Sequence, residues 1–289
     1  MNEEKKRHPI IDDDCLTAFL YWVEERDSIT AKKKAGEPKP WTEDKLLANY
    51  RFVNTHREDD RQTQCLIKNI INNEKLTIRD KVVNIILFRY WGLWETMNLF
   101  GGAWTRKELM TAEPYRYAAE KYKEITASGK KHPFFTSAFY TSGVRVGVRK
   151  ELNINSSVTG AFILAQRAIR DKTPERVIKA PDEESSMKVF KELPGVASTL
   201  AYQMWVDCTY IPEFPFSADN FVVVSPKTKN ILSRLFKDRD GMSLEESLFW
   251  LRDNLNLNLS VMNIEHSLSG FSDYYKAIID NSRPKRRYK

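Results

Sequence analysis

Apolar side chains recur at intervals of three or four residues along most of this chain, as they do on the buried face of a helix. Near the N-terminus, Leu16, Phe19, Leu20 and Val23 follow this spacing. The pattern predicts helices over Asp14–Arg26, Lys45–Phe52, Asp60–Ile71, Ile78–Trp94, Thr105–Ser128, Thr159–Ile169, Asp182–Leu193, Ala197–Val206, Thr228–Phe236 and Ser243–Asn254. Strict alternation is scarce. The sequence therefore predicts an all-α fold, and it leaves room for a short β-hairpin over Phe134–Val148.

Polar segments divide this helical pattern. Asp27–Lys45 contains KKKAGEPKP, whose lysines, glycine and prolines are typical of a loop or linker. Ser243 is followed three residues later by Glu246, which is the spacing of a helix capping box. We predict an N-terminal helix with a basic linker (1–45), a helical domain (46–282) and a basic tail (283–289).

Composition narrows the class of protein. The 289 residues are 42% hydrophobic and 12% aromatic, which is too apolar for a disordered chain. No apolar run approaches the 18 or more residues typical of a transmembrane helix. The first residues, MNEEKKRHPIIDDD, lack the apolar core of a signal peptide. We therefore expect a cytoplasmic protein that does not contact a membrane.

The net charge of +7 is concentrated at one end of the chain. Arg283–Lys289 (RPKRRYK) contains five basic residues and no acidic one, and the remainder is nearly balanced, with 41 basic against 39 acidic residues. A tail of this kind either binds the phosphates of a nucleic acid or is a solvated terminus. Where it binds DNA, we expect it to add affinity without selecting the base.

Several catalytic motifs are missing from the sequence. It contains no GxxxxGK[ST], GxGxxG, HExxH or GxSxG string, and its four histidines are not spaced as metal ligands. We therefore expect neither a metal nor a cofactor, and in particular no nucleotide cofactor.

The segment Lys191–Cys208 (KELPGVASTLAYQMWVDC) predicts two helices joined by a tight Pro-Gly turn, within a hairpin at 185–207. The backbone N–H groups at the start of the second helix would suit a phosphate, and a glycine allows the backbone to approach it. An ordinary corner between two helices is the alternative. The turn residues are Leu193, Pro194, Gly195, Val196, Ala197, Ser198 and Thr199.

Asp219 follows this turn, in FPFSADNFVVVSPKTKNILSRLF. The combination resembles the helix-hairpin-helix DNA glycosylase superfamily. That resemblance implies that the hairpin binds a DNA phosphate and that Asp219 is the catalytic carboxylate. Ala197 replaces the second glycine of the hairpin, and Thr199 stands where bifunctional members have a Schiff-base lysine. The resemblance thus implies hydrolysis of the glycosidic bond without strand cleavage.

Three further segments, Tyr50–Gln64, Asn84–Trp91 and Val261–Lys276, narrow the resemblance. Together with the Asp219 segment they are similar to a phage-associated branch containing the α-glutamyl/putrescinyl thymine pyrophosphorylases. Antiphage glycosylases that act on glucosylated hydroxymethylcytosine are similar too, and related domains include the helical domain of the 5-hydroxymethyluracil DNA kinases. The similarity covers roughly Tyr50–Lys276.

The first candidates for a base pocket are four polar residues. Asn54, Arg57, Asp60 and Arg61 recur at intervals that predict one shared helical face. Such a face is either solvated and salt-bridged or forms a polar wall around a hydrophilic substituent on the base.

Other candidates lie in apolar surroundings. Asn84 and Arg89 interrupt a nearly apolar helix, where a buried polar group needs a partner, so they belong either to the pocket or to a structural network. Glu265 and His266 are pocket residues by resemblance, or else satisfied interior groups. Phe216 precedes Asp219 and would cover a flipped base or simply pack in the interior.

On this basis we expect an antiphage-defence DNA glycosylase that removes a bulky hypermodified pyrimidine from phage DNA and leaves an abasic site, with glucosylated 5-hydroxymethylcytosine as the first candidate for the base. Such an enzyme must first flip the base out of the duplex. The rival expectation is a phage-encoded hypermodification enzyme that displaces pyrophosphate from an activated 5-hydroxymethyluracil. A third is a catalytically silent DNA-binding module.

Overall fold

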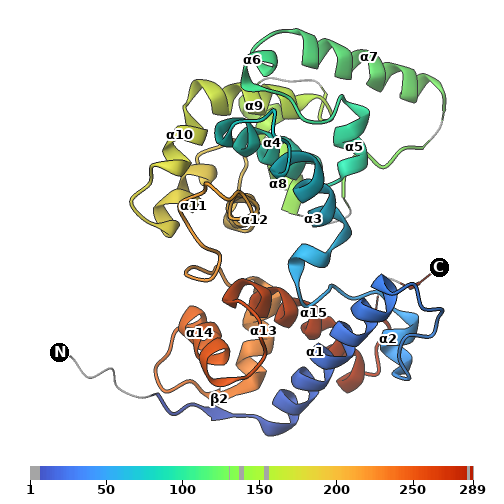
Figure 1. Cartoon of the computed structure of the whole chain (residues 1–289), viewed down its shortest axis with the longest axis vertical. Coiled ribbons are helices and arrows are strands. Elements are labelled where there is room, and N and C mark those ends of the chain that lie inside the picture. The colour runs from blue at the N-terminus through green and yellow to red at the C-terminus, as the bar shows by residue number, and fades with distance from the viewer. Residues whose placement is uncertain (1–6, 130, 137–139, 153–155, 285–286, 289) are drawn as a thin grey trace. The chain divides into compact units, whose positions relative to one another are not determined.

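The computed structural model describes residues 7–129, 131–136, 140–152, 156–284 and 287–288. The fold is mostly helical, with one two-stranded sheet, so the predicted all-α class is confirmed (Figure 1). The chain forms two compact units. Unit 1 combines residues 1–60 with 218–289, and unit 2 comprises residues 61–217. Within the described ranges, no helix has both the length and the apolar character needed to cross a membrane.

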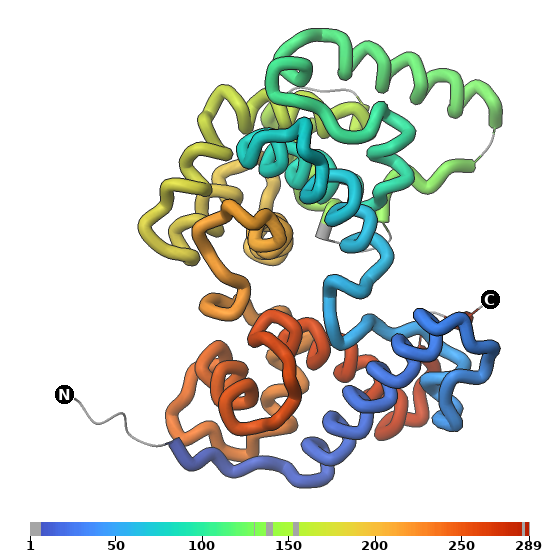
Figure 2. Tube along the Cα trace, viewed as in Figure 1, coloured from blue at the N-terminus to red at the C-terminus, as the bar shows by residue number. Residues whose placement is uncertain are grey.

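Unit 1 is built from the N-terminal and C-terminal segments of the chain, whose blue and orange-to-red parts form one body in the Cα trace (Figure 2). Its elements are β1 (Ile10–Ile11), α1 (Asp13–Lys34), α2 (Lys45–Asn49), a 3-10 turn (Arg57–Asp59), α13 (Pro226–Leu235), β2 (Phe236–Asp238), α14 (Leu244–Asn254) and α15 (Val261–Ile279). α15 packs against α1, α13 and α14, while β1 pairs antiparallel with β2. The capping box predicted at Ser243 and Glu246 is confirmed at the start of α14.

Aromatic residues fill the contact between α1 and α15. Phe19 and Trp22 of α1 are fully buried against Phe271 of α15, with ring centroids 5.2 and 6.1 Å from it. Gly270 makes the approach possible, because a Cβ there would overlap a methyl group of Val53 and lie 3.3 Å from the Trp22 ring. The two ends of the chain thus share one apolar core.

Unit 2 surrounds α4 (Ile78–Trp91), in which every residue from Asp80 to Trp91 is buried. The other elements are α3 (Arg61–Leu66) with a π-helical turn (Ile67–Ile71), α5 (Trp94–Leu99), α6 (Arg106–Leu109), α7 (Glu113–Ala127), α8 (Tyr140–Glu151), α9 (Gly160–Arg170), α10 (Thr173–Ile178), α11 (Glu183–Lys191) and α12 (Ser198–Cys208). α5, α8, α9, α10 and α12 all contact α4. A helix buried on all sides has no polar face, and this explains its nearly continuous apolar sequence.

The predicted end of the first helix and the optional β-hairpin were both wrong. α1 does not end at Arg26 but continues to Lys34, through the first part of the predicted linker, because Ile29 extends its buried face by another turn. The optional β-hairpin at Phe134–Val148 is instead largely α8, with residues 137–139 outside the described ones. Val144 and Val148 lie on its buried side, and this four-residue spacing belongs to a helix.

The turn between α11 and α12 packs directly on α8. Gly195 has a φ of +69°, and a Cβ on it would overlap the backbone of Gly143. A Cβ on Gly147, one turn further along α8, would lie 2.5 Å from both N and Cα of Gly195. Glycine is therefore required on both sides of this contact, because the two backbones touch each other.

We expect Gly147→Ala to lower the free energy of unfolding by about 1–3 kcal/mol, the usual cost of overpacking. Alanine favours a helix by about 1 kcal/mol over glycine, so a net loss identifies the contact with Gly195. Urea titration of the full chain measures it. Val146→Ala is the matched control on the exposed face of α8, where 61% of Val146 is accessible, and a Gly147→Ala protein as stable as this control would contradict the prediction.

Candidate functional site

A polar cluster in unit 1 is centred on Asp60, in the loop that follows α2. Its Oδ1 accepts hydrogen bonds from the backbone N–H of Asn54, at 3.3 Å, and from the Asn54 side-chain amide, at 3.1 Å. Its Oδ2 lies 3.1 Å from Nε2 of His266 on α15. Three residues named from the sequence thus come together, and we call them the Asp60 cluster.

The prediction that Asn54, Arg57, Asp60 and Arg61 share one helical face was wrong. Asn54 lies in an irregular loop, Arg57 begins a 3-10 turn, and Asp60 is in extended conformation at the end of that turn. The loop folds back, so that Asn54 and Asp60 face each other across it. Arg61 begins α3 in unit 2 and pairs with Glu95 of α5 at the surface.

Arg26 supports the cluster from α1 and was missed by the sequence analysis. It is 1% exposed, and its guanidinium donates to the carbonyl of Val53 and to Oδ1 of Asn54, both at 3.0 Å. The signal was present in the sequence, since Arg26 follows Phe19 and Trp22 at helical spacing and precedes Ile29. A basic residue on the buried face of a helix needs acceptors, and here the loop supplies them.

Opposing effects act on the pKa of Asp60. Burial raises it, whereas the hydrogen bond and charge of His266, the N–H of Asn54 and the charge of Arg57 lower it. The lowering effects win, so the carboxyl has a pKa below its ordinary value and is ionised at neutral pH. The Asp60 side chain remains 31% exposed and that of His266 20% exposed. The cluster therefore offers a ligand a partly exposed anionic acceptor, beside an imidazole whose Nε2 faces Asp60 and is itself buried.

The predicted pocket residue Arg57 is nearly buried beside the cluster. Only 4% of it is exposed, and its backbone N–H donates to Oδ1 of Asn263 on α15 at 2.9 Å. The Asn263 amide in turn lies 3.3 Å from both carboxylate oxygens of Glu58. Asn263, which the sequence analysis missed, thus fastens the 3-10 turn to α15.

Glu265 does not join its neighbour His266. Its carboxylate accepts hydrogen bonds from the hydroxyl of Thr228, at 2.7 Å, and from the N–H of Ser225, at 3.1 Å. Ser225 caps the N-terminus of α13, where a negative charge is favourable. Glu265 is therefore a satisfied interior group, one of the two alternatives that its sequence left open.

Asp219 lies at the N-terminus of α15. Its Oδ1 accepts a hydrogen bond from the N–H of Val261 at 2.8 Å, and its carbonyl accepts one from Arg252 at 2.9 Å. The Arg252 guanidinium is also 3.6 Å from Oδ1, and 47% of the Asp219 side chain is exposed. These contacts give Asp219 a role in holding the start of α15 and the end of α14.

In unit 2, the two polar residues of α4 have interior partners. Arg89 forms a buried, bidentate ion pair with Asp207 of α12, in which Nη2 lies 2.6 Å from Oδ1. Asn84 bonds to both the N–H and the carbonyl of Trp104, at 2.9 and 2.6 Å. Both residues belong to structural networks that connect α4 to its neighbours.

The turn residues contribute less surface than the sequence suggested. Leu193 and Val196 are buried, and Gly195 is covered by α8. Ala197 is exposed and begins α12 without a side-chain cap, followed by Ser198 and Thr199, which are half-buried. The predicted pocket residue Phe216 packs edge-on against Phe214, with ring centroids 5.5 Å apart.

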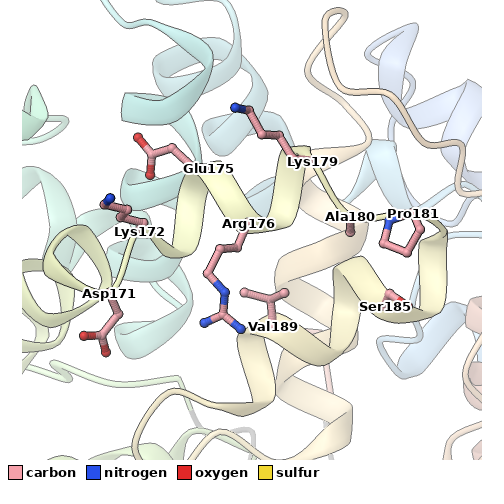
Figure 3. Close-up of a pocket in the computed structure, with 9 residues that line it drawn as sticks. All are labelled: Asp171, Lys172, Glu175, Arg176, Lys179, Ala180, Pro181, Ser185 and Val189. Atoms are coloured by element: carbon pink, nitrogen blue, oxygen red, sulfur yellow. The ribbon is translucent and has the colours of Figure 1, made fainter.

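A cavity of about 450 Å³ opens between α10 and α11 (Figure 3). Its lining residues are Asp171, Lys172, Glu175, Arg176, Lys179, Ala180, Pro181, Ser185 and Val189. Charges of both signs line it, and Arg176 is already engaged by Glu192 through two contacts of 2.6 Å. None of the candidates named from the sequence lies here, so we do not assign a function to this cavity.

We expect Asp60→Asn to lower the free energy of unfolding by about 1–3 kcal/mol at pH 7, because charged hydrogen bonds are lost. Since the folded pKa is lowered, the contribution of Asp60 is full well above the unfolded value of about 3.9. It is lost as the pH falls through the folded pKa. Urea titrations between pH 3 and 7 test this. Asp59→Asn is the control, because Asp59 pairs with the largely exposed Lys34, and a pH-independent difference would refute the prediction.

A second experiment addresses the ion pair between Arg89 and Asp207. Asp207→Asn leaves a guanidinium buried without its counter-charge, which costs about 3–5 kcal/mol. The double variant Arg89→Met with Asp207→Leu removes both charges and should recover most of that loss. Thermal or urea unfolding distinguishes the two, and a double variant no more stable than Asp207→Asn would assign Arg89 a role beyond the pair.

Comparison with known proteins gives one relative with an established name. The chain is 22% identical over 260 residues to the 5-hmdU DNA kinase of Bacillus phage SP10. The alignment covers 86% of this chain but 40% of the relative, so the chain spans less than half of that protein's length. No solved structure matches the chain.

The family model for the helical domain of 5-hmdU DNA kinases matches residues 13–280. This match and the phage kinase show that the glycosylase predictions were wrong. They overturn the superfamily assignment, the hydrolysis of a glycosidic bond and the abasic product. The sequence analysis named these kinase helical domains beside the glycosylases, and the chain matches the kinase domains. The chain belongs to the family of 5-hmdU DNA kinase helical domains.

Proposed function

We propose that this chain acts in the hypermodification of DNA, where it binds DNA containing 5-hydroxymethyl-deoxyuridine and engages the 5-hydroxymethyl group. The observation that carries the proposal is the family match over residues 13–280, which includes helices of both units. The named relative is a kinase of this nucleoside in DNA. That name favours DNA hypermodification, the rival expectation from the sequence, over base excision.

We assign the Asp60 cluster to the hydroxymethyl group. A hydroxyl both donates and accepts hydrogen bonds, and the Asp60 carboxylate can accept one from it, while the imidazole of His266 lies against that carboxylate. Other candidates named from the sequence are engaged elsewhere, Glu265 by α13 and Arg89 by Asp207. The Asp60 cluster combines partial exposure with titratable groups, and this combination favours it.

A kinase uses a nucleotide as phosphate donor, so the expectation that no nucleotide takes part has lost its support. The sequence nevertheless contains no GxxxxGK[ST] loop, whose backbone N–H groups would hold such a donor. We therefore derive no phosphoryl-transfer step, and the proposal for this chain concerns substrate engagement.

Competition binding with fluorescein-labelled duplexes tests the proposal. The duplexes are identical except for one thymine, which is replaced by 5-hydroxymethyluracil. One additional hydrogen bond to a charged group is worth about 1.5 kcal/mol, so we expect roughly tenfold tighter binding of the modified duplex. Equal affinities for the two duplexes would refute the proposal.

Two adjacent residues of α15 supply the variant and its control. His266→Gln should reduce the preference for 5-hydroxymethyluracil to about twofold or less, whereas Glu265→Gln, which alters the contact with α13, should retain it. Two further assays accompany the binding assay. Incubation with γ-labelled ATP detects phosphate transfer, and alkali treatment detects sites from which a base has been removed. Alkali-labile sites without any modification-dependent binding would contradict the proposal.

A further inference from the structure

The C-terminal end of the chain is docked on unit 1. Of the predicted basic tail Arg283–Lys289, residues 285, 286 and 289 lie outside the described residues. Arg287 forms an antiparallel bridge with Tyr50, and the backbone N–H of Tyr288 donates to the carbonyl of Asn49 at 3.0 Å. The described end of the tail is therefore an ordered addition to the segment after α2.

Tyr288 is surrounded by cationic side chains and one tryptophan. Lys33 of α1 donates to the Tyr288 hydroxyl at 2.8 Å, and its Nζ lies 4.6 Å from the centroid of the Trp41 ring. Lys39 is 5.0 Å and Arg51 is 5.5 Å from the centroid of the Tyr288 ring. The Trp41 and Tyr288 rings meet edge to face at 5.8 Å. We call these five residues the Tyr288 patch.

Two cations of the patch, Lys33 and Arg51, have no carboxylate partner among the described residues. By contrast, the next lysine of α1, Lys34, is neutralised by Asp59 at 2.7 Å. Cations gathered around the same rings repel one another, and the attraction to the ring faces offsets only part of that repulsion. A bound anion would relieve it.

The pKa of Tyr288 is influenced by the same positive charges. Burial raises the pKa of its phenol, but the hydrogen bond from Lys33 and the charges of Arg26 and Lys33 more than compensate. The pKa of Tyr288 is consequently below its ordinary value, the direction expected beside excess positive charge.

We propose that the Tyr288 patch is a binding surface for the phosphate backbone of DNA. Its exposed cations, Lys39 and Arg51, would contact phosphates, and the half-buried Trp41 and Tyr288 rings would lie against sugars or bases, as in surfaces that combine basic and aromatic residues. The inference rests on the proposed function for the identity of its ligand. It changes the role of Arg287 and Tyr288, the described end of the basic tail, which become part of a folded surface.

The experiment measures the salt dependence of DNA binding by the full chain, with both thymine and 5-hydroxymethyluracil duplexes. Each phosphate contact contributes about 0.9 to the slope of log K against log salt. The double variant Lys39→Gln with Arg51→Gln should reduce the slope by about two and weaken binding of both duplexes on the order of tenfold. The ratio of the two affinities should stay unchanged.

Two matched proteins control for charge and for folding. Lys39→Arg with Arg51→Lys keeps both charges and should retain the slope. Lys68→Gln with Lys229→Gln removes two exposed lysines elsewhere and should also retain it. An unchanged slope in the patch variant, or an equal loss in the second control, would overturn the inference.

The same measurements separate this inference from the proposed function. A wild-type protein that does not distinguish the two duplexes, but whose slope falls in the patch variant, would refute the proposed function and support the patch. A wild-type protein that distinguishes the two duplexes, but whose slope does not change in the patch variant, would support the proposed function and refute the patch. Binding of the wild type to phosphatidylserine vesicles but not to DNA would overturn the patch as a DNA surface.

Discussion

The candidate site in unit 1 depends on the close packing of α1 against α15. Gly270 allows this packing, because any side chain there would meet Val53 and Trp22. Val53 packs against α15 at Gly270. Arg26, one turn after Trp22, donates a hydrogen bond to the Val53 carbonyl. The following loop then brings Asp60 to His266. An apolar contact between segments more than 200 residues apart thus positions a polar cluster.

Local signals in the sequence were sufficient for most helices but not for their assembly. The capping box at Ser243 and the periodicity of the buried α4 required only neighbouring residues. The extension of α1 to Lys34 and the helical state of α8 depend on what each face packs against, as at Gly147 on Gly195. The joining of both chain ends in unit 1 depends on tertiary contacts alone, which periodicity does not report.

The candidate site could be predicted only in part, because its residues are joined by tertiary contacts that periodicity does not report. Asn54, Asp60 and His266 were recognised as polar residues in suggestive segments, and Asp60 is now connected to Asn54 by a hydrogen bond and to His266 by a contact of 3.1 Å. The need of Arg89 for a partner was also evident from its apolar helix. Its partner, Asp207, lies 118 residues away in the sequence and had no signal of its own. Sequence reasoning therefore identified groups that need partners, whereas only the fold supplies the partners.

The charges of the two proposed surfaces suit different parts of a DNA substrate. The Tyr288 patch is positive and carries no information about the base. The Asp60 cluster contains an ionised carboxylate, which would repel phosphates but accepts a hydrogen bond from a neutral hydroxyl. Phosphorylation of that hydroxyl would place a charge of about −1.5 to −2 beside the carboxylate. On the proposed function, the carboxylate that accepts a hydrogen bond from the neutral hydroxymethyl group therefore disfavours an anionic substituent at the same position.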